Sequence, residues 1–174
     1  MPSTDSGVTS VRILGVDPGL HVTGWALFVL DGEQMGTLTG VVKPPSKSTT
    51  PQRLRAIMIE IGAVIEKHSP TVVAVEQPFV KENVRSAIAL GHSQAAAFLA
   101  AAMHNLPVHE YAPREVKQAV SGDGHATKEA VAAALAMELS LDGDLPALLD
   151  ETDALAIAYC HYLLSRHPAG VGAP

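Results

Sequence analysis

The 174-residue chain has little cysteine, few aromatic residues and no long apolar run. Its one cysteine, Cys160, cannot form a disulfide within the chain, so we expect a reducing compartment, the cytoplasm. The longest uninterrupted apolar run is the nine residues 95–103, whereas a membrane-spanning helix needs about 20. Residues 1–10 also lack the basic-then-apolar order of a signal peptide. These absences argue against a secreted disulfide scaffold, a membrane protein and a fibrous protein.

The composition is that of a folded globular domain. Hydrophobic residues make up 47% of the chain and charged residues 17%, which is enough apolar material for a sizeable core. The length suits one domain. We therefore expect a single domain over residues 11–166, with flexible tails at 1–10 and 167–174.

The net charge of −6 argues, taken alone, against nucleic-acid binding, because phosphate contacts need positive charge. The charges are unevenly distributed, however. Residues 43–130 hold ten of the twelve basic residues and only eight of the eighteen acidic ones, so both ends of the chain are acidic. This pattern fits a phosphate-binding surface beside an acidic site, and it equally fits an ordinary scattered surface.

The hydrophobic pattern predicts three strands, then a helix, a strand, a helix and a strand, and finally helices up to the end of the domain. Asp31-Gly32 is a strong hairpin signal, so the first three strands should be antiparallel neighbours. The later strands are separated by helices, which favours an α/β fold with a mixed sheet and helices on both faces. The predicted strands are 11–17, 22–30, 34–43, 71–76 and 108–111; the predicted helices are 51–67 (capped by Thr50), 82–104, 113–120, 127–139 and 150–165.

Four acidic residues stand where such a fold would bring them together. Asp17 and Glu76 each end an apolar strand, and Asp150 and Asp153 share one face at the start of the last helix. If the two strands are adjacent and parallel, their carboxylates leave the same edge of the sheet. Carboxylates without basic partners repel one another, and a hard divalent cation such as Mg²⁺ removes that repulsion. Two such ions can clamp the attacking and leaving oxygens of a phosphodiester.

Structural explanations of the same acids stay open at this point. Asp150 could be only a helix N-cap, with Asp153 favoured by the helix dipole. Asp17, which is followed by Pro-Gly, could be only part of a turn. Glu76 is harder to explain structurally, because it closes the apolar run TVVAV and precedes Gln-Pro.

Four segments together resemble the RuvC family of Holliday junction resolvases. They are ILGVDPGLHVTGWALF, VVAVEQPFV, HEYAPREVKQAVSGDGHATKEAV and DETDALAIAYCHY, in the family's order and at its spacing. The resemblance implies a ribonuclease H-like fold with a five-stranded mixed sheet. It also implies a homodimeric, metal-dependent endonuclease that nicks two opposite strands of a four-way DNA junction, leaving 5′-phosphate and 3′-hydroxyl ends.

The resemblance also assigns roles to individual residues. The catalytic and metal-holding acids would be Asp17, Glu76, Asp150 and Asp153, binding two Mg²⁺ ions per site, with Mn²⁺ as an alternative. The resemblance places Lys117 and Lys128 beside the site, on the scissile or adjacent phosphate. DNA contacts are further expected from Phe79, stacking on an opened base, and from Lys81 and Arg114 on the backbone. The partner proteins implied are RuvA and RuvB.

The predicted helix 82–104 is apolar on most sides, so most of its surface must be covered. A dimer interface would cover it and would match the twofold symmetry of a four-way junction. A central helix buried within the monomer would satisfy the same pattern.

Three other functions remain open. They are a ribonuclease H-like relative of the YqgF type acting on RNA, a junction-binding module without catalysis, and an ATPase of the actin or sugar-kinase type. The complete acidic set favours a nuclease, and the chain is short for two ATPase domains and has no GxxxxGK[ST] phosphate loop.

Overall fold

The structure is a computed structural model, and it describes residues 10–78, 84–140 and 149–166. The boundaries 1–10 and 167–174 of the predicted tails stay predictions, because these tails lie mostly outside the described residues. The strands are β1 (Val11–Asp17), β2 (Thr23–Asp31), β3 (Gln34–Val42), β4 (Val72–Glu76) and β5 (Val108–Tyr111). The helices are α1 (Thr50–His68), α2 (Val84–Met103), α3 (Pro113–Ser121), α4 (Lys128–Glu138) and α5 (Leu149–Ser165).

The predicted order of elements is confirmed, and the differences are local. The N-cap of α1 is Thr49 rather than Thr50. Oε1 of Gln52, three residues beyond Thr49, accepts hydrogen bonds from the Thr49 backbone N–H at 2.8 Å and from the Thr49 hydroxyl at 3.1 Å, and these bonds fix the helix start one residue earlier.

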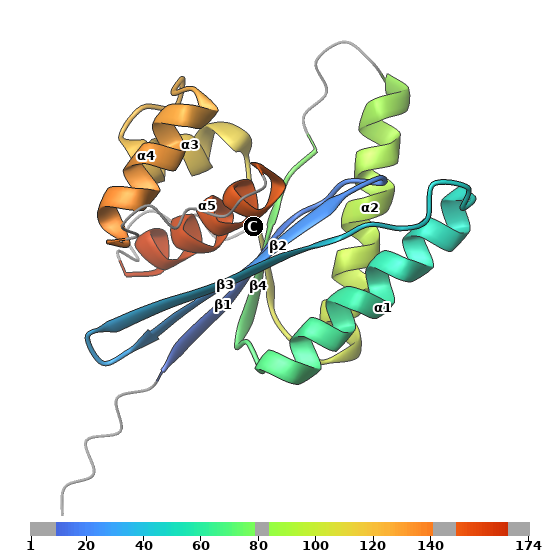
Figure 1. The fold of residues 1–174 in the computed structure, drawn as a ribbon, viewed down its shortest axis with the longest axis horizontal. Coiled ribbons are helices and arrows are strands. Elements are labelled where there is room, and N and C mark those ends of the chain that lie inside the picture. Colours follow the sequence, from blue (N-terminus) through green and yellow to red (C-terminus); the bar gives the residue numbers. More distant parts are fainter. Residues whose placement is uncertain (1–9, 79–83, 141–148, 167–174) are drawn as a thin grey trace, which may run out of the picture.

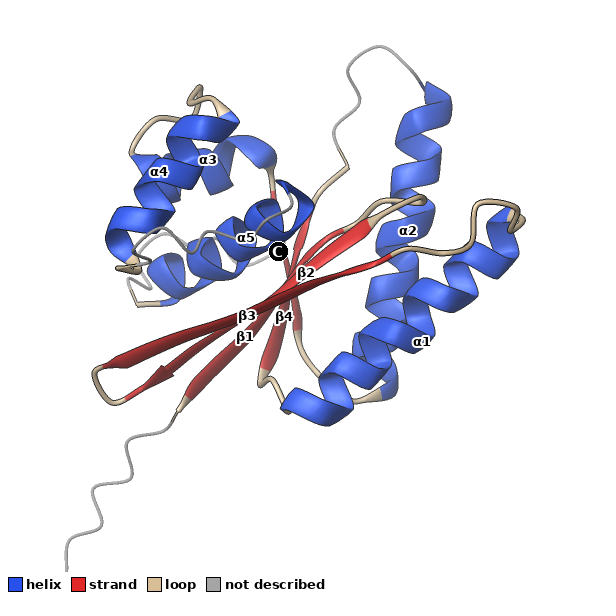
Figure 2. Cartoon of the chain, viewed as in Figure 1, coloured by secondary structure: helices blue, strands red, loops and turns tan. Residues whose placement is uncertain are grey.

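One five-stranded mixed sheet has the order β3-β2-β1-β4-β5. Figure 2 shows this sheet nearly edge-on, with helices on either side. The hairpin between β2 and β3 turns at Gly32, whose φ of 61° is a conformation that glycine adopts without strain. β1 pairs antiparallel with β2, and β2 with β3, whereas β4 lies parallel to both β1 and β5. The expected parallel pairing of β1 with β4 is therefore confirmed.

Helices cover both faces of the sheet, as predicted. α1 and α2 lie on one face, and α3, α4 and α5 lie on the other (Figure 1). Alternate residues of β1 supply the two cores: Leu14 and Val16 pack with α1 and α2, whereas Ile13 packs with α5.

Helix α5 packs directly on the sheet and is buried at Thr152 and from Ala154 to Tyr162. Its backbone lies so close to β1 that a Cβ atom at Gly15 would be 2.1 Å from the Ala154 carbonyl oxygen. The glycine in the middle of β1 is what permits this contact.

Helix α2 is only partly covered. Its buried side carries Ser93, Gln94 and small alanines, so the alternative of a central helix buried within the monomer does not hold. The opposite side exposes an apolar stripe at helical spacing, made of Val84, Ile88, Leu99 and Met103, which are 53–70% exposed.

By length and composition alone, α2 is also the one helix of the described part that could cross a membrane, a property that the apolar run length did not reveal. Core helices of soluble proteins have the same length and composition.

Candidate active site

Two of the predicted acids leave the same edge of the sheet. Asp17 is the last residue of β1 and Glu76 the last residue of β4. The register pairs Val16 with Val75, the residues directly before them, so the two carboxylates follow adjacent positions on parallel neighbours. This is the edge at which α/β sheets form their sites.

The other two acids come from the first turns of α5, which is held against this edge by a second glycine. Gly24 is the residue of β2 that pairs with Asp17. A Cβ atom at Gly24 would lie 2.0 Å from the backbone carbonyl oxygen of Asp150. The missing side chain therefore lets the start of α5, with Asp150 and Asp153, approach Asp17.

We expect Gly24→Ala to move the start of α5 and to destabilise the fold by about 2–4 kcal/mol, because backbone would collide with the new methyl group. Chemical denaturation measures the effect. Gly36→Ala on β3 is the matched control, since nothing lies within 4 Å of the Cβ it would add. A Gly24→Ala protein as stable as the Gly36→Ala protein would contradict the close approach.

The four carboxylates influence one another. Burial raises the pKa of Asp17 to about 8, helped by the nearby charges of Glu76, Asp153 and Asp150 and opposed by that of Lys128. Burial and the charge of Asp153 likewise raise the pKa of Glu76. A raised carboxyl pKa of this kind is typical of acids clustered at a functional site, where a bound cation would neutralise their charges.

Two lysines border the acids, as the resemblance implied. Lys128, the first residue of α4, donates a hydrogen bond from Nζ to Oδ2 of Asp153 and forms an ion pair with it. Burial lowers the pKa of Lys128, but this hydrogen bond and the surrounding carboxylates raise it overall. Lys117 on α3 is close enough to Glu76 to lower the pKa of that carboxyl group.

The donor set fits a hard divalent cation in its chemistry. All four acids offer carboxylate oxygens, which Mg²⁺ and Mn²⁺ prefer. Within the described ranges, no three His, Cys, Asp or Glu side chains already stand together as a metal-binding group. Instead, the ammonium group of Lys128 pairs with Asp153. A cation that binds Asp153 would therefore displace this lysine, and a cation that binds Asp17 would displace the proton held by its carboxyl group.

The remaining predicted residues are placed as follows. Arg114 is exposed on α3, and its side chain lies across Gly124. Phe79 and Lys81 lie outside the described residues. Asp150 is inside α5, which begins at Leu149, so its interpretation as an N-cap is wrong.

Cys160 is fully buried, and burial raises the pKa of its thiol to about 12. Cys160 is therefore a core residue, and it is excluded as a nucleophile because the reactive form is the thiolate.

Sequence reasoning missed Gln94, which holds the end of β4. This buried residue of α2 donates from Nε2 to the backbone carbonyl of Glu76 at 3.3 Å and to Oε2 of Glu110 at 2.8 Å. The sequence did contain a signal for it, because Gln94 is a polar residue directly before three alanines in an otherwise apolar helix. Gln94 thus joins the helix with the exposed apolar stripe to the strand that carries an acid.

Arg53 was also missed, and it ties together two loops near Asp17. Its buried guanidinium donates to the carbonyl oxygens of Ser48 at 3.0 Å and Ser46 at 2.6 Å. It also lies 3.2 Å from Nδ1 of His21, in the loop that follows Asp17. Arg53 therefore fixes the segment before α1 against the loop after β1.

A mixed sheet of this order, with acids at the ends of β1 and β4 and on α5, defines a nuclease of the ribonuclease H-like class. The family model described as "Crossover junction endodeoxyribonuclease RuvC" matches residues 13–161. The chain belongs to the RuvC family, whose members are metal-dependent nucleases.

Individual relatives agree with this assignment. A RuvC from Dehalococcoides mccartyi is 43% identical over 154 residues, which cover 87% of this chain and 91% of the relative. A RuvC from Maricaulis maris is also 43% identical, over 87% of this chain and 90% of the relative.

Solved structures agree as well. T. thermophilus RuvC, in complex with a Holliday junction substrate, superposes with a TM-score of 0.84 at 32% identity, over 91% of this chain and 96% of that one. The yeast mitochondrial resolvase Ydc2, with a TM-score of 0.62 at 13% identity over 90% and 81%, shares the fold. The predicted family, fold class and enzyme class are thus confirmed, and the ATPase alternative is discarded.

Proposed function

We propose that this chain acts as a homodimer that resolves four-way DNA junctions during recombination and repair, nicking two opposite strands. The observation that carries the proposal is the convergence of Asp17, Glu76, Asp150 and Asp153 on one sheet edge beside two lysines. That arrangement supports hydrolysis of a phosphodiester, and membership of the RuvC family supports a junction as the substrate.

In this proposal the four acids hold two Mg²⁺ ions, with Mn²⁺ as an alternative. When bound, the metal supplies Lewis-acid chemistry that activates a water and neutralises charge on the phosphate. Asp17 and Glu76 are fixed by rigid strands, and Asp150 and Asp153 by a buried helix, so the ligands are held from several directions. The products would carry 5′-phosphate and 3′-hydroxyl ends.

The basic residues would act on the DNA itself. Lys128, released from Asp153, and Lys117 would stabilise charge that develops on the scissile phosphate. Arg114 and Lys81 would contact the backbone, and Phe79 would stack on a base opened at the junction. RuvA and RuvB are the proposed partners, and the single buried thiol of Cys160 supports a reducing compartment such as the cytoplasm.

The apolar stripe of α2 supports the dimer. Val84, Ile88, Leu99 and Met103 would each be more than half exposed in a monomer, and a second copy of the same helix would cover them. Gln94, on the opposite side of α2, would then link this interface to Glu76.

We expect Leu99→Glu to weaken self-association at least tenfold, because it places a charge in the middle of the stripe. Analytical ultracentrifugation measures the change. Ile59→Glu is the control, since Ile59 is a 46% exposed apolar residue on α1, away from the stripe. Equal self-association of the two variants would mean that α2 is not the interface.

Cleavage of a synthetic immobile four-way junction, with a matched linear duplex as the control substrate, tests the proposed function. We expect symmetric nicks in the junction only, and only with Mg²⁺ or Mn²⁺. Binding without cleavage with either metal would indicate a non-catalytic binding module. Preferential cleavage of structured RNA would favour the RNA-processing alternative.

A further inference from the structure

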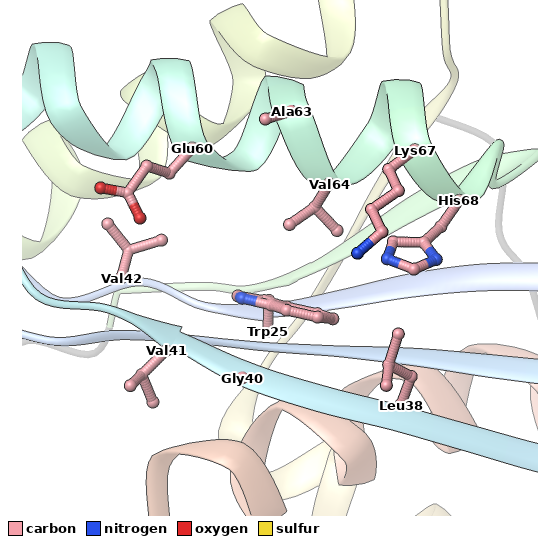
Figure 3. A pocket seen from close by; sticks show the side chains of 10 residues that line it. All are labelled: Trp25, Leu38, Gly40, Val41, Val42, Glu60, Ala63, Val64, Lys67 and His68. Atoms are coloured by element: carbon pink, nitrogen blue, oxygen red, sulfur yellow. The ribbon is translucent and has the colours of Figure 1, made fainter.

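A groove lies between α1 and the edge strand β3, and its floor is the single tryptophan of the chain (Figure 3). Its volume is about 440 Å³. Trp25 projects from β2 over Gly40 of β3, where a Cβ atom would lie 2.5 Å from the indole ring. The groove is lined by Trp25, Leu38, Gly40, Val41, Val42, Glu60, Ala63, Val64, Lys67 and His68.

The two ends of the groove carry opposite charge (Figure 3). Glu60 marks one end, and Lys67 marks the other, in the last turn of α1. His68 lies beside Lys67, and burial and the charges of Lys67 and Arg12 lower its pKa, so the lysine supplies the positive charge there. Arg12 adds positive charge at the second end, where its Nε donates to the His68 carbonyl oxygen at 2.9 Å. Between the ends the side chains are apolar, so the groove offers an apolar seat with a basic end and an acidic end.

The strand that borders the groove is open to pairing. β3 lies at the edge of the sheet, and within the described residues it pairs only with β2. Its outer backbone N–H and C=O groups can therefore receive an extended peptide, whose alternate side chains would point into the groove.

The groove opens on the face of the sheet opposite to the acids. Trp25 pairs with Val16, whose side chain belongs to the core under α1, whereas the acids are gathered beside α5 on the opposite face. Helix α2, which carries the exposed apolar stripe, packs against α1 and β4, and β4 lies three strands away from β3 in the sheet order.

We propose that this groove docks an extended segment of a partner protein, with an apolar side chain on Trp25 and an acidic residue beside Lys67 and His68. The apolar lining and Glu60 favour a peptide over nucleic acid, since a phosphate backbone needs positive charge along its whole path. The open edge of β3 favours an extended peptide over a helix. This inference is independent of the chemistry at the acidic site.

A random twelve-residue peptide library displayed on phage, selected against the full-length protein, tests the proposal. We expect the enriched peptides to share an apolar or aromatic residue and an aspartate or glutamate at fixed spacing. Synthetic copies should change the emission of Trp25, and hydrogen exchange at β3 amides should slow on binding. Failure to enrich any peptide, or binding without a change at Trp25 and β3, would overturn the proposal.

Three variants sharpen the test. Ala63→Phe fills the groove from an exposed position of α1 and should abolish binding, whereas Lys67→Glu should weaken it at least tenfold and favour peptides whose acid is changed to lysine. Arg55→Glu makes the same charge change at an exposed position of α1 outside the groove and should alter affinity less than twofold. Junction cleavage by all three variants checks that they fold.

Two further results would overturn the proposal by naming another occupant. Oligothymidine that changes Trp25 emission and displaces the selected peptides would identify the groove as a nucleic-acid site. Self-association that Ala63→Phe abolishes while Leu99→Glu does not would identify a second copy of this chain as the occupant.

Discussion

Asp17→Asn is expected to reduce junction cleavage at least about 10³-fold while junction binding is retained. Asp17 is the acid whose ionisation the site opposes most clearly, because burial and three neighbouring carboxylates all raise its pKa. An amide at this position keeps the shape but loses the negative charge that would hold a divalent cation. Strand cleavage under single-turnover conditions and a gel-shift measurement of binding check the two parts separately.

The matched control is Asp31→Asn, the same substitution in an exposed residue at the far end of β2. It should cleave at the wild-type rate. Cleavage by Asp17→Asn within tenfold of wild type would remove Asp17 from the catalytic site, and a loss of binding together with cleavage would indicate a structural role instead.

The second large effect is a fall in the stability of the metal-free protein with rising pH. Asp17 has a pKa of about 8 in the folded state and an ordinary pKa of 3.8 in the unfolded chain, so between these values the folded chain binds a proton that the unfolded chain has released. Its contribution therefore lowers the free energy of unfolding as pH rises, and the change ends near pH 8.

His161 determines the pH range in which the contribution of Asp17 to stability is best measured. Its buried ring lies 2.7 Å from the Tyr111 hydroxyl, and burial lowers its pKa from 6.5 to about 4. Its contribution weakens the fold as pH falls below 6.5, which opposes the effect of Asp17 in that range. Between pH 6.5 and 8, the contribution of Asp17 should lower the free energy of unfolding by about 2 kcal/mol.

Denaturant unfolding in the presence of a chelator measures this slope. Asp17→Asn should be more stable than wild type at pH 8. Its free energy of unfolding should not show the fall between pH 6.5 and 8 that Asp17 causes in wild type. Saturating Mg²⁺ should stabilise wild type more at pH 8 than at pH 6.5, because the cation replaces the proton. Parallel pH profiles for wild type and Asp17→Asn would contradict the raised pKa.

The sequence by itself determined the elements and the identity of the acids. Apolar runs ending in Asp17 and Glu76 predicted strands because β1 and β4 are buried on both faces, and such strands carry continuous apolar residues. The Asp31-Gly32 turn predicted the hairpin because few residues adopt a positive φ. These signals depend on neighbours along the chain, so a reader of the sequence can detect them.

Only the tertiary structure decided how the elements meet. The approach of α5 to β1 and β2 depends on Gly15 and Gly24. In the sequence, these glycines are recognisable only as residues of low strand propensity within apolar strands. The pair of Lys128 with Asp153 joins residues 25 positions apart. No periodicity encodes such contacts, because they arise when separate elements are packed together.

The same reason explains α2 and the groove. Composition showed that α2 needs cover, but the packing of α1 and β4 decides which side remains exposed. Trp25 would be read as an ordinary core residue of a strand, and it lines a groove only because β3 is the last strand of the sheet. Local sequence thus determined the chemistry that this protein carries, and packing decided which groups face one another and which face solvent.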